Sequence, residues 1–302
     1  MVRLQWLRPD RGYGKVGLRQ AGVQTTQGCS GYDPIEGAGI WSSLRGGVRV
    51  VESERVAFRL RALTPEFRRK CAIARKRVRT ALERIARDQL RRGDSRALGY
   101  VAFSGGKDST VVLDLVLATN PSIDICWYDD GWDYPETLEF LEATEVRLGK
   151  HILRVTYPPE HLWAGADPDR EHPSDMLAHE INDRYASVFL GLRAQESGMR
   201  RWLFAGRGYL YWHKGDKQWH CCPIYDWATE DIWAYIAEHE LPYNAVYDRL
   251  AELGVPLEQR RVGPLTAGRA YRFGAMAILH RGWPFLFNRF VECVGRYPTQ
   301  FT

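Results

Sequence analysis

The spacing of apolar residues first becomes regular over residues 64–92, where they recur every three or four positions. This spacing gathers them on one face of a helix and leaves the charged residues on the other. Thr64 provides an N-cap, Pro65 occupies the first helical position, and Gly93 follows the last periodic residue. The pattern therefore predicts one long amphipathic helix that ends before Gly93.

Short apolar runs then alternate with helical spacing. Residues 97–103, 123–128 and 151–155 have the length and composition of buried strands, and residues 110–118 and 136–148 have the spacing of helices. Such alternation predicts a parallel sheet with right-handed crossovers and a ligand site beyond the carboxyl ends of its strands. We therefore expect an α/β fold: a doubly wound, mostly parallel sheet, with a basic helix before it and a helical C-terminal part.

Four regions differ in composition. Residues 1–60 include a glycine-rich stretch without a sustained period, and we expect an extended or loop-rich appendage there. Residues 61–95 carry the basic helix and residues 96–265 the α/β domain. Residues 266–302 are expected to form a helical segment that packs on this domain.

The composition is that of a globular protein. With 302 residues and a hydrophobic fraction of 45%, the chain can bury a substantial core. It has no run of about 18 apolar residues, and its first residues lack the apolar stretch of a signal peptide. We therefore expect a cytoplasmic protein without a membrane partner. The six cysteines show no C-x-x-C spacing, which argues against a zinc ribbon and favours reduced thiols.

Positive charge is concentrated before the predicted sheet. The net charge is only +5, but the segment from Arg55 to Arg92 has fourteen basic residues and three acidic ones. A solvated helix face is the simplest interpretation of this surplus. The alternative is a nucleic acid, or another phosphate-rich partner, bound through residues 64–92.

A glycine-rich loop follows the first predicted strand directly and opens the next helix. Adjacent glycines allow a ligand to approach the backbone closely, and N–H groups at a helix N-terminus favour a bound anion. The spacing of this loop differs from that of G-x-x-x-x-G-K-[ST] nucleotide loops. Its residues are Ser104, Gly105, Gly106, Lys107, Asp108 and Ser109.

These six residues resemble the S-G-G-x-D-[ST] loop of the ATP pyrophosphatase (PP-loop) superfamily, which has the adenine nucleotide alpha hydrolase-like fold. Three further segments resemble the phosphoadenosine phosphosulfate (PAPS) reductase family within it. Residues 129–137 resemble its D-T-G-x-x-x-P-E-T segment, and residues 191–200 its G-x-R-x-x-E-S-x-x-R segment. Residues 223–233 resemble its P-[IL]-x-x-W-x-x-x-D-[IV]-W segment. The resemblance implies an enzyme that binds an adenine nucleotide.

The resemblance also implies roles for the matching positions. The loop would hold the phosphates, and Asp108 would lie near the nucleotide or a magnesium ion. The catalytic residues would be Lys107, Asp108, Arg193 and Arg200. Nucleotide binding would use the six loop residues with Asp129, Gly131, Gly191, Arg193 and Arg261. Arginine suits phosphate or sulfate oxygens because its guanidinium group is forked and always charged.

Plainer interpretations exist for three of these groups. Asp108 could order the loop through backbone hydrogen bonds. The arginines of residues 191–200 could form surface ion pairs. Either Arg260 or Arg261 could reach the site, or both could belong to a basic surface loop.

The sequence departs from the reductases of this family at the cysteines. Those enzymes carry a thiolate in a Glu-Cys-Gly-Leu-His tail, and the nearest match here, Cys293, lies in an aromatic helix-like run where we expect a buried, inert thiol. Cys221 and Cys222 form a pair without the downstream C-x-x-C of iron–sulfur members, so no iron–sulfur cluster is expected. The chain instead resembles members from mobile-element and DNA phosphorothioation systems.

Our leading hypothesis is a PP-loop ATP pyrophosphatase that binds ATP with Mg²⁺ and cleaves it to AMP and pyrophosphate, thereby activating a substrate. The substrate could be DNA or RNA undergoing sulfur modification, including phosphorothioation, with a sulfur-carrier or modification-complex protein as partner. The first alternative is a sulfonucleotide reductase that uses Cys293 or the Cys221–Cys222 pair. The second is a non-catalytic nucleotide-sensing or DNA-binding module.

Overall fold

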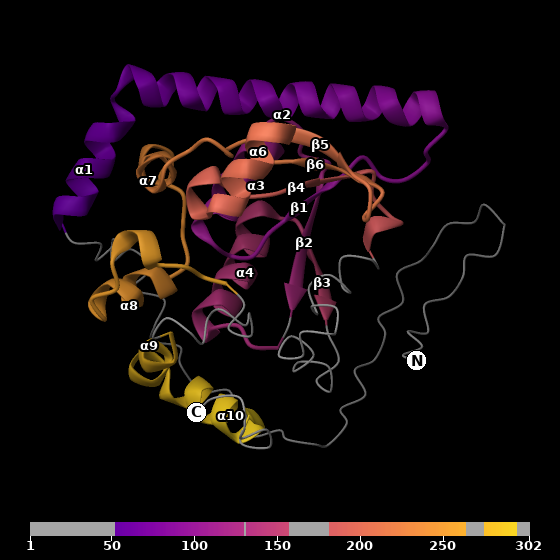
Figure 1. Cartoon of the computed structure of the whole chain (residues 1–302). Coiled ribbons are helices and arrows are strands. Elements are labelled where there is room, and N and C mark those ends of the chain that lie inside the picture. The colour runs from indigo at the N-terminus through magenta and orange to yellow at the C-terminus, as the bar shows by residue number, and fades with distance from the viewer. Residues whose placement is uncertain (1–51, 130, 157–180, 264–274, 295–302) are drawn as a thin grey trace. The chain divides into compact units, whose positions relative to one another are not determined.

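The computed structural model describes residues 52–129, 131–156, 181–263 and 275–294. Residues 48–302 form one compact unit, so the basic helix and the sheet belong together. Figure 1 shows this helix along the top of the view, with the strands below it.

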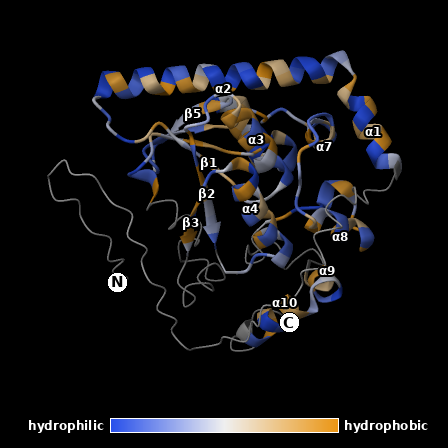
Figure 2. Ribbon diagram, turned by 180° about the vertical axis from the view of Figure 1, so that it is seen from behind, coloured by the Kyte–Doolittle hydropathy of each residue, from blue (hydrophilic) through white to orange (hydrophobic). Residues whose placement is uncertain are grey.

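The helix predicted from the apolar spacing is α2, Pro65–Arg92. Oγ1 of Thr64 accepts a hydrogen bond from the backbone N of Phe67, and Gly93 adopts the left-handed conformation that ends many helices. Hydrophobic and hydrophilic residues alternate in bands along α2 in Figure 2, as expected of an amphipathic helix. The prediction of this helix and of both its caps is confirmed.

A second helix, α1 (Glu52–Ala62), lies within the region expected to be loop-rich, so that expectation was wrong for its last residues. The ring of Phe58 stacks on Trp233, with 5.9 Å between ring centroids, and Ala62 is also buried. A helix this short depends on tertiary packing rather than on its own propensity, which is why the local pattern did not reveal it. Residues 1–51 of the expected appendage lie outside the described residues.

Six strands form one sheet in the order β3-β2-β1-β4-β6-β5. β5 pairs antiparallel with β6, and the other neighbours are parallel, so the expected doubly wound, mostly parallel sheet is confirmed. The chain passes from β1 to β2 and β3 on one side and then to β4 on the other. The strands are β1 Tyr100–Ala102, β2 Asp124–Asp129, β3 Ile152–Thr156, β4 Ser187–Phe189, β5 Leu210–His213 and β6 Gln218–Cys221.

Helices cover both faces of this sheet. Val101 and Ile125 point into the main core, which includes apolar residues of α2, while Tyr100 and Cys126 point into a second cluster on the other face. The helices are α3 Lys107–Leu117, α4 Pro135–Leu148, α6 Gly198–Arg207, α7 Thr229–Glu238, α8 Val246–Glu252, α9 Ala275–Gly282 and α10 Pro284–Val294. Two short 3₁₀ helices are Ala194–Glu196 and Leu257–Gln259.

The elements expected between residues 97 and 155 are all present, with bounds shifted by a few residues. In the C-terminal region, α9 and α10 contact the sheet domain. Nε1 of Trp283 donates to Glu136, 2.9 Å from Oε2, and Phe290 packs against Trp132. Among the described residues, no helix combines the length and apolar character needed to cross a membrane.

Candidate nucleotide-phosphate site

The glycine-rich loop lies where the strand order reverses, at the carboxyl end of β1. Ligands of doubly wound sheets bind at such switch points. Gly105 has a φ of +67°, a conformation that strains residues with a side chain. A Cβ at Gly105 would also lie 3.2 Å from Cγ2 of Thr137. Both observations explain why glycine stands at this position.

The loop presents hydrogen-bond donors. Because α3 begins at Lys107, the loop leads into the N-terminus of that helix. Among the described residues, none accepts a hydrogen bond from the backbone N–H of Gly105 or Gly106. Ser104 is exposed, and its Oγ lies 3.2 Å from Oγ of Ser109. Backbone N–H groups and hydroxyls in this arrangement can hold phosphate oxygens.

Two residues, Tyr247 and Asn244, hold the loop from outside it. The hydroxyl of Tyr247 accepts a hydrogen bond from the backbone N of Lys107 at 2.9 Å. Nδ2 of Asn244 donates to Oγ1 of Thr137 at 2.9 Å and to the carbonyl of Gly105 at 3.4 Å. These roles are not evident from the sequence. A single polar residue such as Asn244 among apolar neighbours is too common a signal to have revealed its contact with the loop.

Asp108 lies between two cations. Its Oδ2 is 2.8 Å from Nζ of Lys107, and its Oδ1 is 2.5 Å from Nε of Arg193. Lys107 and Arg193 are both buried. Burial by itself would raise the pKa of Asp108, but the charges of Lys107 and Arg193 outweigh it and lower that pKa. The carboxylate is therefore ionised at neutral pH.

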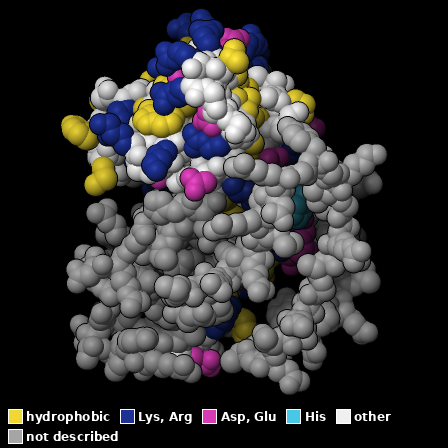
Figure 3. Space-filling view, turned by 90° about the vertical axis from the view of Figure 1, so that its right-hand side faces the viewer, with side chains coloured by type: hydrophobic (Ala, Val, Ile, Leu, Met, Phe, Trp, Pro, Cys, Tyr) yellow, Lys and Arg dark blue, Asp and Glu magenta, His cyan; other side chains and the backbone are white. Residues whose placement is uncertain are grey.

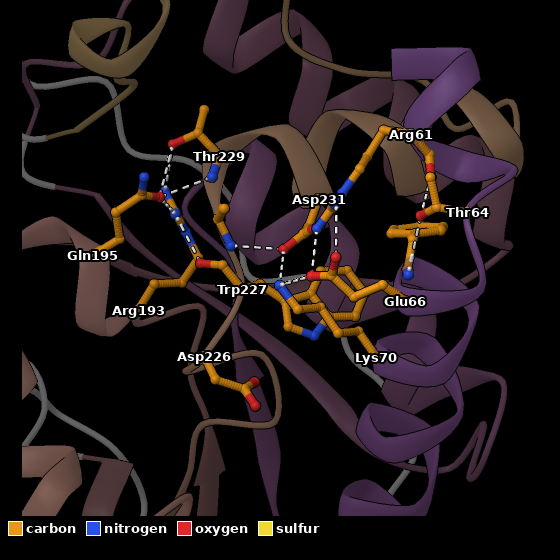
Figure 4. A network of polar contacts seen from close by, with 12 residues as sticks. Arg61, Thr64, Glu66, Lys70, Arg193, Gln195, Asp226, Trp227, Thr229 and Asp231 are labelled. Atoms are coloured by element: carbon orange, nitrogen blue, oxygen red, sulfur yellow. Dashed lines mark hydrogen bonds and ion pairs between the residues drawn. The ribbon is translucent and has the colours of Figure 1, made fainter. Parts of the chain in front are cut away.

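Arg193 is fixed by the segment that leads into α7. Its Nη1 donates to Oε1 of Gln195 at 2.8 Å and to the carbonyl of Trp227 at 3.2 Å (Figure 4). Oε1 of Gln195 also accepts from the backbone N of Thr229 at 2.8 Å. Most donors of the guanidinium group are thus used within the protein. In this structure Arg193 positions Asp108 and the loop.

Gly191 explains how this arginine comes so close to the loop. A Cβ at Gly191 would lie 2.8 Å from the carbonyl carbon of Asp108 and 2.8 Å from the backbone N of Ser109. Backbone atoms cannot yield as a flexible side chain can. The segment after β4 therefore passes directly against the start of α3 because residue 191 lacks a side chain.

The geometry does not favour Asp108 as a direct magnesium ligand. Each of its oxygens already accepts a charge-assisted hydrogen bond, one from Lys107 and one from Arg193. A divalent cation at this carboxylate would also approach two positive charges. The arrangement instead favours an ordering role for Asp108, through ion pairs with Lys107 and Arg193 rather than through the backbone hydrogen bonds considered from the sequence.

Two other residues proposed from the sequence, Asp129 and Arg200, are held by contacts within the protein. Asp129 ends β2, next to β1, and its Oδ1 accepts from the backbone N of Gly131 at 2.8 Å. The guanidinium of Arg200 pairs with Glu196, which also accepts from the backbone N of Arg193 at 2.8 Å. Arg200 is therefore connected to the loop through Glu196 and Arg193.

Arg260 and Arg261 have different environments. Arg260 is buried, pairs with Glu54 of α1 at 2.9 Å and donates from Nε to the carbonyl of Val255. It therefore anchors α1 and is not directed to the nucleotide site. Arg261 is exposed, and the next residue, Val262, lies close to Gly106: its carbonyl oxygen would be 3.5 Å from a Cβ there. Arg261 is thus the arginine next to the loop.

The segment of residues 223–233 has a structural role that the sequence did not reveal. Asp231 is fully buried and accepts from Nε of Arg61 at 2.9 Å and from Nζ of Lys70 at 2.6 Å (Figure 4). It also accepts from the backbone N of Ala228 at 2.9 Å, at the start of α7. Burial favours a higher pKa for Asp231, but these partners lower it. One carboxylate thus joins α1, α2 and α7.

Many basic side chains of α2 form ion pairs or ring contacts with other residues of the protein. Besides Lys70, Arg77 pairs with Asp226 at 2.6 Å, and Arg84 and Arg92 lie over the rings of Trp219 and Trp212. Lys and Arg side chains nevertheless gather at the top of the molecule in Figure 3, where α2 lies. The exposed basic residues of the helix that face away from the core are Arg68, Arg69, Lys76, Arg79 and Arg87.

The cysteines whose side chains are described are all buried. Burial raises the pKa of Cys222 to about 12 and that of Cys221 well above its usual value. Burial likewise raises the pKa values of Cys71 and Cys126 to about 12. None of these four thiols is ionised near neutral pH, so none is an activated nucleophile. The side chain of Cys293 lies outside the described residues.

Fold and loop together define a class of protein: an α/β domain with a glycine-rich loop, suited to phosphate groups, at the carboxyl edge of a doubly wound sheet. The sequence profile of the phosphoadenosine phosphosulfate reductase domain matches residues 99–263, more than half of the chain. The chain therefore belongs to the PAPS reductase domain family.

Curated relatives agree with this assignment. The chain is 30% identical over 162 residues to adenosine 5'-phosphosulfate reductase of Shouchella clausii, covering 49% of this chain and 65% of that protein. It is 28% identical over 212 residues to an uncharacterized protein of Methanocaldococcus jannaschii, covering 65% of this chain and 41% of that protein. In both comparisons the chain spans less than two thirds of the relative.

Solved structures with related folds are more distant. PAPS reductase from Candida auris has a TM-score of 0.39 at 17% identity, over 58% of this chain and 85% of that one. FMN adenylyltransferase from Candida glabrata has a TM-score of 0.44 at 12% identity, over 65% of this chain and 66% of that one. Similarity at this level carries no functional assignment.

Proposed function

We propose that this protein is an ATP pyrophosphatase of the PAPS reductase-like family, which cleaves ATP to AMP and pyrophosphate to activate a second substrate. One observation carries the proposal: the loop of residues 104–109 presents phosphate-binding donors, while each described cysteine is buried with a raised pKa. Phosphoryl chemistry needs positioning and charge stabilisation rather than a protein nucleophile.

The residues of the loop have distinct parts in this reaction. The backbone N–H groups of Gly105 and Gly106 and the hydroxyl of Ser104 bind the phosphate oxygens. Lys107 contributes positive charge, and its ion pair with Asp108 keeps the loop in its binding conformation. An acceptor oxygen attacks the α-phosphorus, the bond to the bridging oxygen breaks, and pyrophosphate leaves. Magnesium accompanies ATP in solution.

A nucleic acid is the second substrate that best fits the exposed charge. Arg69, Lys76 and Arg87 recur at nearly whole numbers of helical turns along the solvent-facing side of α2. A row of cations with this spacing can follow a phosphate backbone. Transfer of AMP to an oxygen of DNA or RNA would prepare it for sulfur insertion, as in phosphorothioation, with sulfur supplied by a carrier or modification-complex protein.

The first test is a product analysis with radiolabelled ATP and Mg²⁺, with and without DNA or RNA. We expect AMP and pyrophosphate from the wild type and a loss of at least tenfold in Ser104→Ala, because Ser104 is an exposed loop donor. The matched control is Ser122→Ala, an exposed serine outside the loop, which keeps full activity. ATP that stays intact under all conditions contradicts the proposal. If nucleotide binding persists without cleavage, the protein is a nucleotide-sensing module.

A sulfonucleotide reductase is the second candidate, and the relatives named as such reductases favour it. In that reaction a thiolate attacks the sulfur of the sulfonucleotide, and a dithiol such as thioredoxin then releases sulfite. Cys293 is the candidate thiol. Thioredoxin-dependent release of sulfite that disappears in Cys293→Ser, and persists in Cys222→Ser, would establish this function in place of ATP cleavage.

A further inference from the structure

The hairpin of β5 and β6 carries a cluster of metal-ligating atoms that the proposed function does not use. His213 ends β5, Asp216 lies in the turn, and His220 lies in β6. One ligand atom from each of the three residues lies within 4.8 Å of the others. Nδ1 of His213 is 2.9 Å from Oδ2 of Asp216, and Nε2 of His220 is 2.8 Å from the same oxygen.

The strand register explains why these residues meet. Tyr211 pairs with His220 and His213 pairs with Gln218 across the antiparallel ladder. His213 and His220 are therefore diagonal neighbours on one face of the hairpin, where their rings stack with 4.7 Å between centroids. Trp212 and Trp219 occupy the opposite face, toward α2. The turn then brings Asp216 back to the histidine face.

The three ligand atoms of this cluster approach one another closely. Nδ1 of His213 accepts a hydrogen bond from the backbone N of Asp216 at 3.2 Å, so this nitrogen carries no proton and cannot donate to Oδ2. Nε2 of His220 is buried and faces the same oxygen at 2.8 Å. The unprotonated Nδ1 of His213 and the carboxylate oxygen of Asp216 repel each other at 2.9 Å unless a cation lies between them. A cation at this point would contact all three ligand atoms.

We propose that His213, Asp216 and His220 bind a divalent transition-metal ion of the Zn²⁺ type. Two imidazole nitrogens and one carboxylate oxygen form a ligand set that zinc uses, with water in the fourth position.

The position of the cluster indicates a structural metal. His220 is in register with Val188, and Val188 with Tyr100, the first residue of β1. The cluster thus lies toward the amino ends of the parallel strands, whereas the loop of residues 104–109 lies beyond their carboxyl ends. A metal here pins the edge strand β5 to β6 across the turn. It takes no part in nucleotide cleavage.

The test uses the untagged full chain after removal of metals with a chelator. We expect calorimetric titration with ZnCl₂ to show one ion per chain, and Co²⁺ to produce visible d–d absorption. At about one hundred times the dissociation constant, Zn²⁺ should raise Tm by roughly 5 °C. His213→Ala and Asp216→Asn should each weaken binding at least tenfold, since each removes one of three ligands.

The matched control is His151→Ala, because His151 forms a surface pair with Glu145 at 2.8 Å outside the hairpin. It should bind Zn²⁺ like the wild type. Circular dichroism and Tm without metal show whether the variants fold. The proposal is overturned if the folded wild type shows no saturable Zn²⁺ binding, or if both hairpin variants bind as tightly as the control; the three residues are then a hydrogen-bonded turn. ATP cleavage is not a readout, so this outcome is independent of the proposed function.

Discussion

Oδ1 of Asp108 lies 2.5 Å from Nε of Arg193, although 85 positions separate the two residues in the sequence. This pair joins the loop after β1 to the segment after β4. β1 and β4 are the neighbouring strands between which the strand order reverses. Because both partners are largely removed from water, the pair fixes the loop in one position and links its conformation to the entry of α7.

Replacing Asp108 by Asn should reduce both stability and ATP cleavage. The change leaves Lys107 and Arg193 buried without a counter-charge, and breaking a buried ion pair typically costs about 3–5 kcal/mol. Urea unfolding measures the free energy, and product analysis measures cleavage. A double-mutant cycle with Arg193→Met tests the pairing: coupling below about 0.5 kcal/mol would contradict it.

Gly191→Ala should disrupt the phosphate loop. The new Cβ would lie 2.8 Å from backbone atoms of Asp108 and Ser109, so the loop must shift, and we expect ATP affinity to fall at least tenfold. Isothermal titration with a non-hydrolysable ATP analogue measures it. The matched control is Gly206→Ala in α6, where a Cβ meets nothing within 4 Å; alanine should raise helix stability there by up to about 1 kcal/mol. If both variants bind ATP with equal affinity, the close approach of residue 191 to Asp108 and Ser109 is not needed for nucleotide binding.

Asp231→Asn should destabilise the protein by about 3 kcal/mol because it leaves Arg61 and Lys70 without their buried partner. Thermal or urea unfolding measures the loss. Asp226→Asn is the matched control: its partner is Arg77, but Asp226 is exposed, so a change below about 1 kcal/mol is expected. Similar losses in the two variants would show that burial of Asp231 is not what makes it important.

Stability should decline with acid, in part through Asp231. The folded protein lowers the pKa of this carboxyl, so its contribution is complete above the unfolded-state value of about 3.9 and is lost as the pH falls through the lower, folded-state pKa. Urea unfolding of the wild type at pH 7, 4 and 3 should show the decline. Asp231→Asn should show a shallower one, and an identical decline would assign the effect to other carboxylates.

Neutralising the exposed face of α2 should weaken nucleic-acid binding. The triple change of Arg69, Lys76 and Arg87 to Gln removes three cations that do not support the core. Nucleic-acid affinity should therefore fall, and the negative slope of log K against log salt should become shallower by about 2–3. Fluorescence anisotropy with labelled DNA and RNA measures both. Changing Arg147, Arg184 and Arg281 to Gln provides a charge-matched control away from α2. If the α2 variant binds nucleic acid as tightly as the wild type, the basic residues of α2 only keep this face of the helix solvated.

The sequence by itself determined the features of the fold that depend only on residues close together in the chain. The caps at Thr64 and Gly93, the period of α2 and the alternation of strands and helices are local properties, and they predicted these elements and the place of the loop correctly. The glycines of the loop could also be found because their backbone conformation is a local requirement.

Only the tertiary structure decided which charges meet. Arg193 was expected to face a ligand, yet its donors are used by Asp108, Gln195 and Trp227. Arg260 pairs with Glu54, at a sequence separation of 206, in a helix that the local pattern did not reveal. Burial and ion pairing join residues distant in sequence, and the free energy of each pair depends on its removal from water. No local pattern encodes that removal, so the roles of these charges follow from the packing of the sheet and its helices.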